Sequence, residues 1–172
     1  MKKIIALTAL CIGCLLPAAA QKFAMVDMEY IMSNIPAYER ANEQLNQTSK
    51  KWKAEVEALD NQAKTLYKNY QNEAVFLSEA QKKEREQAIV DKEKEASELR
   101  KKYFGPQGEL YKKRIALIEP IQDEVYNAIK GIAQQRGYQL VLDRATETAG
   151  IIFASPSIDI SNEVLAKLGY EK

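Results

Sequence analysis

The sequence predicts an α+β protein: a small oligomeric, β-rich body that carries a long antiparallel α-helical coiled-coil hairpin. The first observation is a heptad pattern of apolar residues within residues 38–118, a region rich in strong helix formers. The second is that short strand-like runs flank this region on both sides. The third is that these runs are too few to build a stable sheet within one chain. We therefore expect other copies of the chain to cover them.

The first twenty residues have the features of a secretory signal peptide. Two lysines near the start precede an apolar stretch that is too short to span a bilayer, and small residues follow it. We therefore expect cleavage near Ala20/Gln21 and loss of residues 1–20. A lipoprotein anchored at Cys14 is the weaker alternative, because Cys11 stands where a lipobox has Leu.

The composition of the mature chain excludes several kinds of active site. Both cysteines lie in the expected signal peptide, and the chain has no histidine. Disulfides, thiolate nucleophiles, Ser-His-Asp and Cys-His catalysis, and the common zinc sites are therefore excluded. The glycines of FGPQGE do not form a P-loop, because only two residues separate them. No carboxylate pair stands out as a general acid and base, so we expect neither enzymatic activity nor a cofactor.

Charge is nearly balanced along the chain. The whole sequence has a formal net charge of +1. Residues 38–118 hold 17 basic and 14 acidic residues, whereas the rest of the mature chain holds 6 and 10. The strong basic footprint of a nucleic-acid-binding protein is missing, so we expect no nucleic-acid partner.

A short strand and a helical turn are expected before the hairpin. Residues 23–28, FAMVDM, are mostly apolar and typical of a strand. A brief helical turn follows. Pro36 suits the first position of the next helix, because proline lacks an N–H group that would be unpaired there.

The outgoing arm of the hairpin is predicted from apolar residues at alternating steps of three and four. Such a pattern, sustained over this length, favours a coiled-coil seam over a globular core helix. Asn42, Ser49 and Glu73 are polar exceptions to it. The two sets of seam positions are Tyr38, Leu45, Trp52, Leu59 and Leu66, and Ile35, Val56, Ala63, Tyr70 and Leu77.

The chain is expected to turn near residues 76–78 and to run back beside the first arm. Ser78 and Gln81 have the spacing of a capping box at the start of a fresh helix. Each arm then has about 40 residues and a length of roughly 60 Å. Residues that recur every seven positions on the return arm are Ile89, Ala96, Tyr103, Leu110 and Leu117.

The return arm is interrupted at Gly105, Pro106 and Gly108. Pro106 removes one backbone hydrogen bond, so a tolerated kink is one interpretation. The functional interpretation is a hinge that lets the outer hairpin bend. Counting back from the tip places Gly105 opposite Trp52, and we expect the indole to fill the space beside the missing Cβ.

The C-terminal part returns to mixed structure. Pro120 is expected to kink or restart the helix, which then runs to Arg136 with Gly137 as its C-cap. The expected domains are the signal peptide over residues 1–20, the hairpin arm over 38–118, and an oligomerisation body over 21–37 and 119–172.

Two further strands and a short helix complete the predicted body. The strands cover residues 138–143 and 151–154, and the helix has Asp159 or Ser161 as its cap and ends at Gly169. The core that the copies share is predicted to consist of Phe23, Met25, Val26, Leu140, Leu142, Ile151, Ile152 and Phe153.

Aromatic residues on the arms have two interpretations. They pack in the seam, or they form a surface for an apolar client, since rigid aromatics gain contact area at modest entropic cost. Phe76, at the expected tip, is the best candidate for exposure. The residues predicted to face a client are Tyr67, Tyr70, Phe76 and Phe104.

The order of these segments resembles the Skp/OmpH family of periplasmic chaperones over essentially the whole mature chain. The two ends carry the resemblance, FAMVDMEYIMSNIP at the start and YQLVLDRATETAGIIFASPSIDISNEVLAKLG at the finish. It implies a periplasmic homotrimer, in which strands of three subunits form one body and three hairpins surround a cavity. It also implies that unfolded outer membrane proteins are held in that cavity without ATP.

The near-neutral charge departs from the strongly basic enteric members of this family. Electrostatic capture of acidic clients is therefore not carried over. The same holds for a lipopolysaccharide site, and nothing in the sequence supports contact with lipopolysaccharide or a membrane surface. The loose candidates for such a site are Lys82, Lys83, Arg85, Arg100, Lys101 and Lys102.

The sequence therefore predicts an ATP-independent holdase chaperone for unfolded outer membrane proteins. Strands of such proteins alternate apolar and polar residues and aggregate when left unpaired in water. The alternative is a structural coiled-coil spacer or adaptor in the cell envelope. A spacer should keep a continuous seam and a stiff arm. The glycine break and the polar seam positions favour a flexible arm instead.

Overall fold

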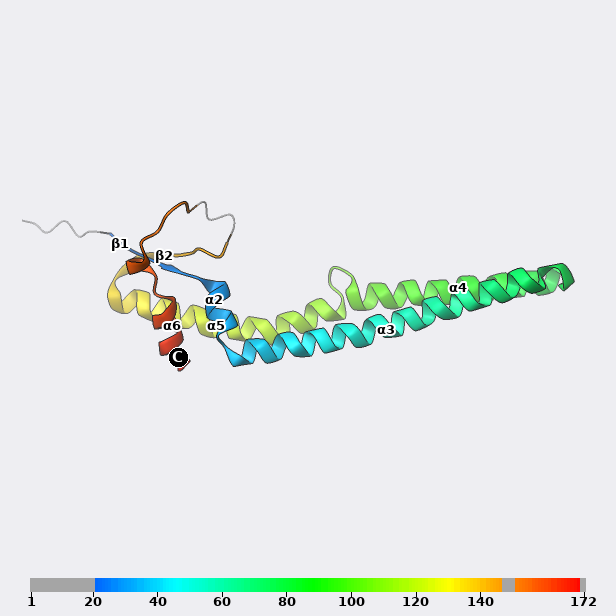
Figure 1. Cartoon of the computed structure of the whole chain (residues 1–172), viewed down its shortest axis with the longest axis horizontal. Coiled ribbons are helices and arrows are strands. Elements are labelled where there is room, and N and C mark those ends of the chain that lie inside the picture. The colour runs from blue at the N-terminus through cyan, green and yellow to red at the C-terminus, as the bar shows by residue number, and fades with distance from the viewer. Residues whose placement is uncertain (1–20, 147–150, 171–172) are drawn as a thin grey trace, which may run out of the picture.

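The computed structural model describes residues 21–146 and 151–170, and it shows a small body from which a long helical hairpin extends (Figure 1). The predicted signal peptide lies outside these residues. No helix among them is long and apolar enough to cross a membrane. In chain order the elements are β1 (Lys22–Val26), α2 (Met28–Ser33), α3 (Pro36–Glu73), the 3-10 turn η1 (Ala74–Phe76), α4 (Glu79–Phe104), α5 (Glu109–Arg136), β2 (Tyr138–Asp143), the 3-10 turn η3 (Pro156–Ile158) and α6 (Ser161–Lys167).

The outgoing arm is the single helix α3, and α4 and α5 return beside it in succession (Figure 1). α3 has 38 residues, which gives a length of roughly 57 Å. Pro36 lies in its first turn as predicted. Every predicted seam position is buried or half-buried, apart from the polar exception Glu73, which is exposed. The heptad therefore identified the sides of α3, α4 and α5 that are covered in the hairpin.

The turn at the tip lies where the sequence placed it. α3 passes into η1, and Ser78 then caps α4. The Ser78 side chain accepts a hydrogen bond from the Gln81 amide, and the Gln81 side chain accepts one from the Ser78 amide. This capping box satisfies backbone donors that would otherwise be unpaired at the start of α4.

The break in the return arm is a complete interruption of the helix. α4 ends at Phe104, residues 105–108 loop out of the arm, and α5 begins at Glu109 (Figure 1). The Gly108 amide donates to the Gly105 carbonyl across this loop, at 2.8 Å. α3 runs past the loop without interruption, so only one of the two sides of the hairpin is broken.

Pro120 does not restart a helix, which was one of the two outcomes predicted for it. It lies inside α5, an unbroken helix of 28 residues. Its side chain is exposed, while the neighbouring Ile118 and Ile121 are buried in the core. Packing of these neighbours outweighs the lost backbone hydrogen bond, as tertiary context commonly does. α5 consequently belongs to the arm at its start and to the body at its end.

The two strands form a small parallel sheet. Phe23 pairs with Leu140, Met25 with Leu142, and Val26 with Asp143. Parallel neighbours need a long crossover connection, and here the whole hairpin supplies it. Gly137 ends α5 in the left-handed conformation, at φ 71°, and thereby turns the chain into β2.

The third predicted strand is absent from this chain. Residues 151–155 have no regular secondary structure. The side of β1 away from β2 is taken by Asp159, which bridges Met25, and by the Ile160 amide, which donates to the Met25 carbonyl. At Met25 the outer edge of β1 is therefore occupied by residues 159 and 160 instead of residues 151–154. The helix that follows begins after Ile160, and Asp159 accepts hydrogen bonds from the Ser161 amide and hydroxyl.

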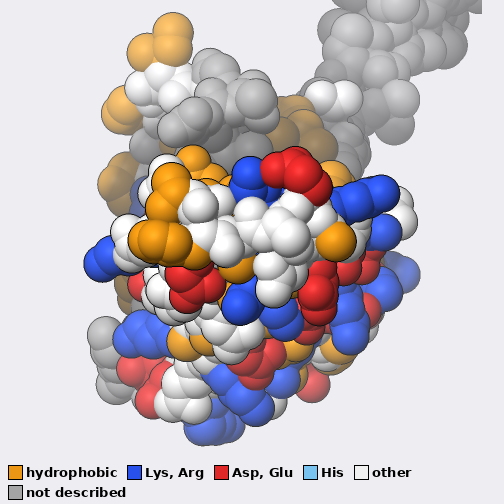
Figure 2. Space-filling model, turned by 90° about the vertical axis from the view of Figure 1, so that its right-hand side faces the viewer, with side chains coloured by type: hydrophobic (Ala, Val, Ile, Leu, Met, Phe, Trp, Pro, Cys, Tyr) orange, Lys and Arg blue, Asp and Glu red, His pale blue; other side chains and the backbone are white. Residues whose placement is uncertain are grey.

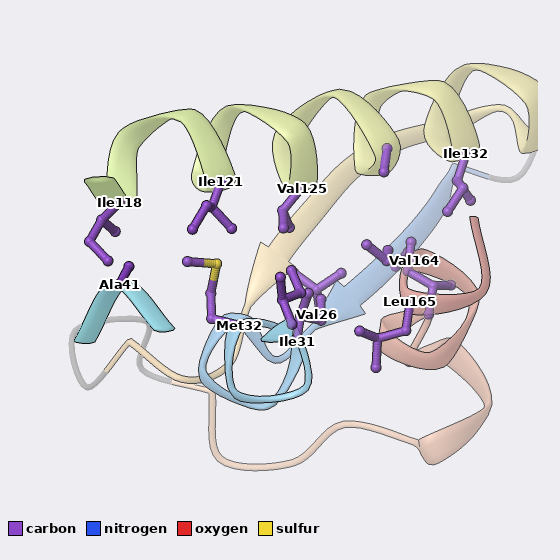
Figure 3. Packing of buried hydrophobic residues seen from close by; sticks show 14 residues of the cluster. Val26, Ile31, Met32, Ala41, Ile118, Ile121, Val125, Ile132, Val164 and Leu165 are labelled. Carbon is purple, nitrogen blue, oxygen red and sulfur yellow. The ribbon is translucent and has the colours of Figure 1, made fainter. Parts of the chain in front are cut away.

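The core of the body lies between α5 on one side and α2, β1 and α6 on the other (Figure 3). Its fully buried large side chains are Ile31, Val125 and Val164, one from each of these three helices. Ala41 of α3 and Ile118 of α5 extend the same cluster to the base of the arm. The arm is therefore rooted in the body by continuous apolar packing.

Candidate functional site

The tip of the hairpin carries the most exposed apolar side chains of the arm. Val75 and Phe76 are 82% and 86% exposed. They lie on η1, a turn too short to bury them, while the next residue, Leu77, is half-buried against the arm. The view onto the tip shows apolar side chains beside charges of both signs (Figure 2). The predicted exposure of Phe76 is confirmed.

Tyr67 and Tyr70 stand near the tip but differ in accessibility. Tyr67 is about half exposed, and its hydroxyl accepts a hydrogen bond from the side-chain Nε2 of Gln71. Tyr70 is half-buried and donates its hydroxyl proton to Glu86 of α4. This hydrogen bond to a carboxylate raises the pKa of Tyr70. Tyr67 is thus open to a ligand, whereas Tyr70 joins α3 to α4.

A stack of aromatic rings joins the two sides of the arm at its middle. Trp52 and Tyr103 stack with ring centroids 4.5 Å apart and planes 6° from parallel. The Tyr103 hydroxyl donates to Glu55 at 2.7 Å, which raises the pKa of Tyr103. Phe104 packs edge-on against Tyr103. Phe104, predicted to face a client, is half-buried in this stack.

The sequence predicts that the Trp52 indole fills the space beside Gly105, and this prediction is wrong. A Cβ atom at Gly105 would stand 2.4 Å from the Lys101 carbonyl oxygen, and the indole stacks two residues earlier, on Tyr103. At Gly108 a Cβ atom would meet three backbone atoms within 3.0 Å. Close approach of backbone to backbone therefore explains both glycines.

Open hollows interrupt the packing of the arm. One, of about 630 Å³, lies at the looped-out residues 105–108 and is flanked by Lys101 and Lys112. Another, of about 220 Å³, includes the polar seam positions Asn42 and Ser49. Small polar side chains at these positions leave space where a larger apolar residue would complete the seam.

Three apolar residues farther along the arm are exposed and were not predicted to face a client. Val90 lies on α4, and Tyr111 and Ile115 lie on α5. The signal that could have found Val90 and Ile115 is their position outside the heptad frame, since an apolar residue off the seam of a polar helix points elsewhere.

The residues predicted to form a shared oligomer core divide into two groups. Met25 and Val26 are buried within the protomer. The others, apart from the half-buried Ile151, are exposed in the single chain. Phe23 pairs beside Leu140, so the sheet bears exposed apolar side chains. The exposed members of the set are Phe23, Leu140, Leu142, Ile152 and Phe153.

Half of the basic residues noted on the arm form ion pairs with neighbouring carboxylates. Arg100 pairs with Asp60 at 2.7 Å and Arg85 with Glu73 at 3.6 Å, and both pairs cross between α4 and α3. Lys82 pairs with Glu79 on its own helix. Exposed pairs contribute little stability, but they neutralise charge locally. In the described part of the chain, no three His, Cys, Asp or Glu residues gather where they could hold a metal ion.

Comparison with known proteins gives one family and one fold. The family model described as outer membrane protein (OmpH-like) matches residues 22–168. The crystal structure of an OmpH-like protein from Caulobacter crescentus CB15, a candidate outer membrane chaperone, superimposes with a TM-score of 0.67. The two chains are 14% identical, and the match covers 87% of this chain and 85% of the other. No match is found among curated proteins.

Proposed function

Because the chain belongs to the OmpH-like outer membrane protein family, we propose that it is an ATP-independent holdase chaperone of the periplasm. In this proposal, three copies assemble through their bodies, and an unfolded outer membrane protein is held in the cavity between the three arms. Family membership supports a chaperone role. The signal peptide would be removed near Ala20/Gln21 on export.

The observation that carries the proposal is the exposed apolar set at the outer end of the arm. Val75, Phe76 and Tyr67 are held in the open by a rigid helix, a 3-10 turn and a capping box. Complete burial of one such side chain contributes about 1.5–3 kcal/mol. A client that covers several of them in part is held, and each contact breaks separately, so release needs no nucleotide.

Assembly of several copies is supported by the apolar surface that one chain leaves uncovered. A two-stranded sheet is not stable alone, and here it bears the exposed Phe23, Leu140 and Leu142. Shared burial of these side chains among three bodies would set three arms around one cavity.

The looped-out residues 105–108 are proposed as the hinge of the arm. They interrupt only the return side, and open space adjoins them. The continuous α3 would then bend while α4 and α5 change their mutual angle at the loop. A wider or narrower cavity could in this way accommodate clients of different size.

One feature favours the alternative role of a spacer or adaptor in the cell envelope. α3 is unbroken over its whole length, and the Trp52–Tyr103 stack and the Arg100–Asp60 pair hold α4 against it. A spacer needs this stiffness. It does not need the exposed Phe76 at the tip, and we therefore retain it as the second hypothesis.

The decisive experiment is dilution of a urea-unfolded outer membrane barrel protein into buffer with the mature chain. We expect light scattering to be suppressed at about one trimer per client. A spacer would leave aggregation unchanged, and its native mass would not rise when the unfolded client is present. Absence of suppression at a several-fold excess would reject the holdase function.

A matched pair of variants tests whether the outer end of the arm holds the client. Replacement of Tyr67, Val75 and Phe76 by Ser should raise the chaperone concentration needed for half-suppression several-fold. The control is Tyr126→Ser, because Tyr126 is similarly exposed but lies on the body portion of α5. If both variants suppress aggregation like the wild type while remaining assembled, the client surface lies elsewhere.

A further inference from the structure

A polar junction lies where both strands end and α2 and α6 begin. The Asp27 carboxylate caps α2 by accepting from the Tyr30 amide, and the Asp27 amide donates to the buried Ser161 hydroxyl at the start of α6. Asp143, the last residue of β2, accepts from the Met28 amide. Three parts of the chain that are distant in sequence are therefore joined by hydrogen bonds at one point.

Arg144 closes this junction with its guanidinium group. Its Nε lies 3.0 Å from Asp27 and its Nη1 lies 3.2 Å from Asp159. Its own amide donates to the Val26 carbonyl, at the end of β1. Both carboxylates are about one-fifth exposed. Removal of the guanidinium would leave two partly buried negative charges facing each other.

The tie between Arg144 and Asp159 joins the two ends of the segment that connects β2 to α6. Arg144 directly follows β2, and Asp159 bridges β1 just before α6. Between these ends, Ile152 and Phe153 are 101% and 84% exposed. Two adjacent large apolar side chains in water favour a partner surface that buries them.

A second copy of the chain is the partner that fits this pair. Each copy carries the exposed apolar pair and also the exposed Phe23, Leu140 and Leu142 on its sheet. The segment is continuous with that sheet, because Asp159 bridges Met25. Both sides of a head-to-tail contact, the kind that closes a ring of three copies, therefore occur on every chain.

We propose that Arg144 is a positioning residue for self-association. Arg144 forms ion pairs with both Asp27 and Asp159, and these pairs fix where Ile152 and Phe153 meet a second copy. This role of Arg144 rests on the assembly proposed above, and it adds the ion pairs that position the contact between copies. Arg144 itself need not touch the neighbour. Loss of the guanidinium removes the direct link between the two ends and leaves Asp27 and Asp159 without their shared cation, so the segment between them is held less firmly. Docking of the apolar pair then carries an ordering cost that the wild type does not have.

The test measures sedimentation of the mature chain over a range of concentrations. The concentration of half-assembly is the protein concentration at which half of the chains are assembled. We expect Arg144→Met to raise it about tenfold or more, with helical content retained. Asp159→Asn removes the paired charge but keeps an oxygen for Ser161, and it should have a similar effect. The two changes together should add little beyond either one, because they break the same tie.

The matched control is Arg136→Met. Arg136 is also an exposed arginine of the body, and it pairs with Glu163 at 2.8 Å, but that pair joins α5 to α6 and does not touch the segment. Its loss should leave the concentration of half-assembly unchanged. Phe153→Asp should abolish assembly, because it places a charge in the contact.

The outcomes separate this proposal from the proposed function. A wild-type chain that remains monomeric at every concentration overturns both the assembly and the role of Arg144. An assembling wild type with an unaffected Arg144→Met, or with an unaffected Phe153→Asp, overturns only the present proposal. So does a lower thermal midpoint in Arg144→Met at an unchanged concentration of half-assembly. If Arg144→Met fails to fold, Asp159→Asn and Arg144→Lys decide in its place, and wild-type assembly by both overturns the proposal.

Discussion

Substitution of Val125 by Ala tests whether the body has the core described above. Val125 is 0% exposed and lies on α5, facing α2 and β1 (Figure 3). One buried methylene typically contributes about 0.5–1.5 kcal/mol, so the two methyl groups lost here contribute about 1–3 kcal/mol. Alanine is the better helix former and returns about 0.5 kcal/mol. The net loss of unfolding free energy is about 1.5 kcal/mol.

This loss should lower the thermal midpoint by about 3–6 °C for a chain of this size. The assay is thermal unfolding followed by circular dichroism at one fixed protein concentration, because assembly makes the midpoint concentration-dependent. Val90→Ala on α4 is the matched control, since Val90 is 53% exposed. We expect the control to change the free energy by no more than about 0.5 kcal/mol. Equal losses in both variants would refute the assignment of Val125 to the core and of Val90 to the surface.

Two further predictions concern the arm. Tyr70 and Tyr103 each donate a hydroxyl hydrogen bond to a carboxylate on the facing helix, and this bond raises the pKa of each tyrosine above the ordinary 10.0. The stability that these bonds provide is complete below the pKa of the unfolded state. It is lost as pH rises through the raised pKa values of the folded state. A titration of tyrosinate absorbance in the folded protein should therefore show a component that ionises above the ordinary value of 10.0, and the absence of such a component would contradict the bonds. Gly108→Ala should destabilise the loop by about 1–3 kcal/mol, because its Cβ would meet backbone atoms, whereas Gly131→Ala should stabilise α5 by up to about 1 kcal/mol, because its Cβ would meet only the flexible end of a lysine side chain. Thermal unfolding distinguishes the two changes, and an equal effect of both would show that the loop is not tightly packed.

The hairpin was predictable because its determinants are local. The seven-residue spacing depends only on helix geometry, and it identified which side chains of α3 and α4 are covered. Ser78 with Gln81, and Gly137, mark helix ends through bonds within four residues of sequence. The position of Phe76 at the tip followed from those boundaries.

The predictions that failed concern features of the fold that depend on contacts between distant parts of the chain. Pro120 breaks a helix by local rules, but Ile118 and Ile121 hold that helix in the core on either side of it. The partner of Trp52 depends on the exact register between two helices, and a two-residue offset moved it from Gly105 to Tyr103. The predicted strand at residues 151–154 has apolar side chains, but the edge of β1 is already occupied by a segment farther along the chain.

The distribution of charge and apolar surface on the arm bears on how a client would be held. Arg85 and Arg100 join α4 to α3 through ion pairs, so much of their charge is neutralised within the arm itself. The exposed apolar residues of the arm, in contrast, are spread from the tip at Phe76 to Tyr111 near the loop. A folded partner usually binds one contiguous patch, whereas scattered single contacts suit an extended chain that can shift among them. This arrangement favours the proposed holdase over a spacer, and under that proposal weak apolar contact, rather than charge attraction, would be the basis of capture.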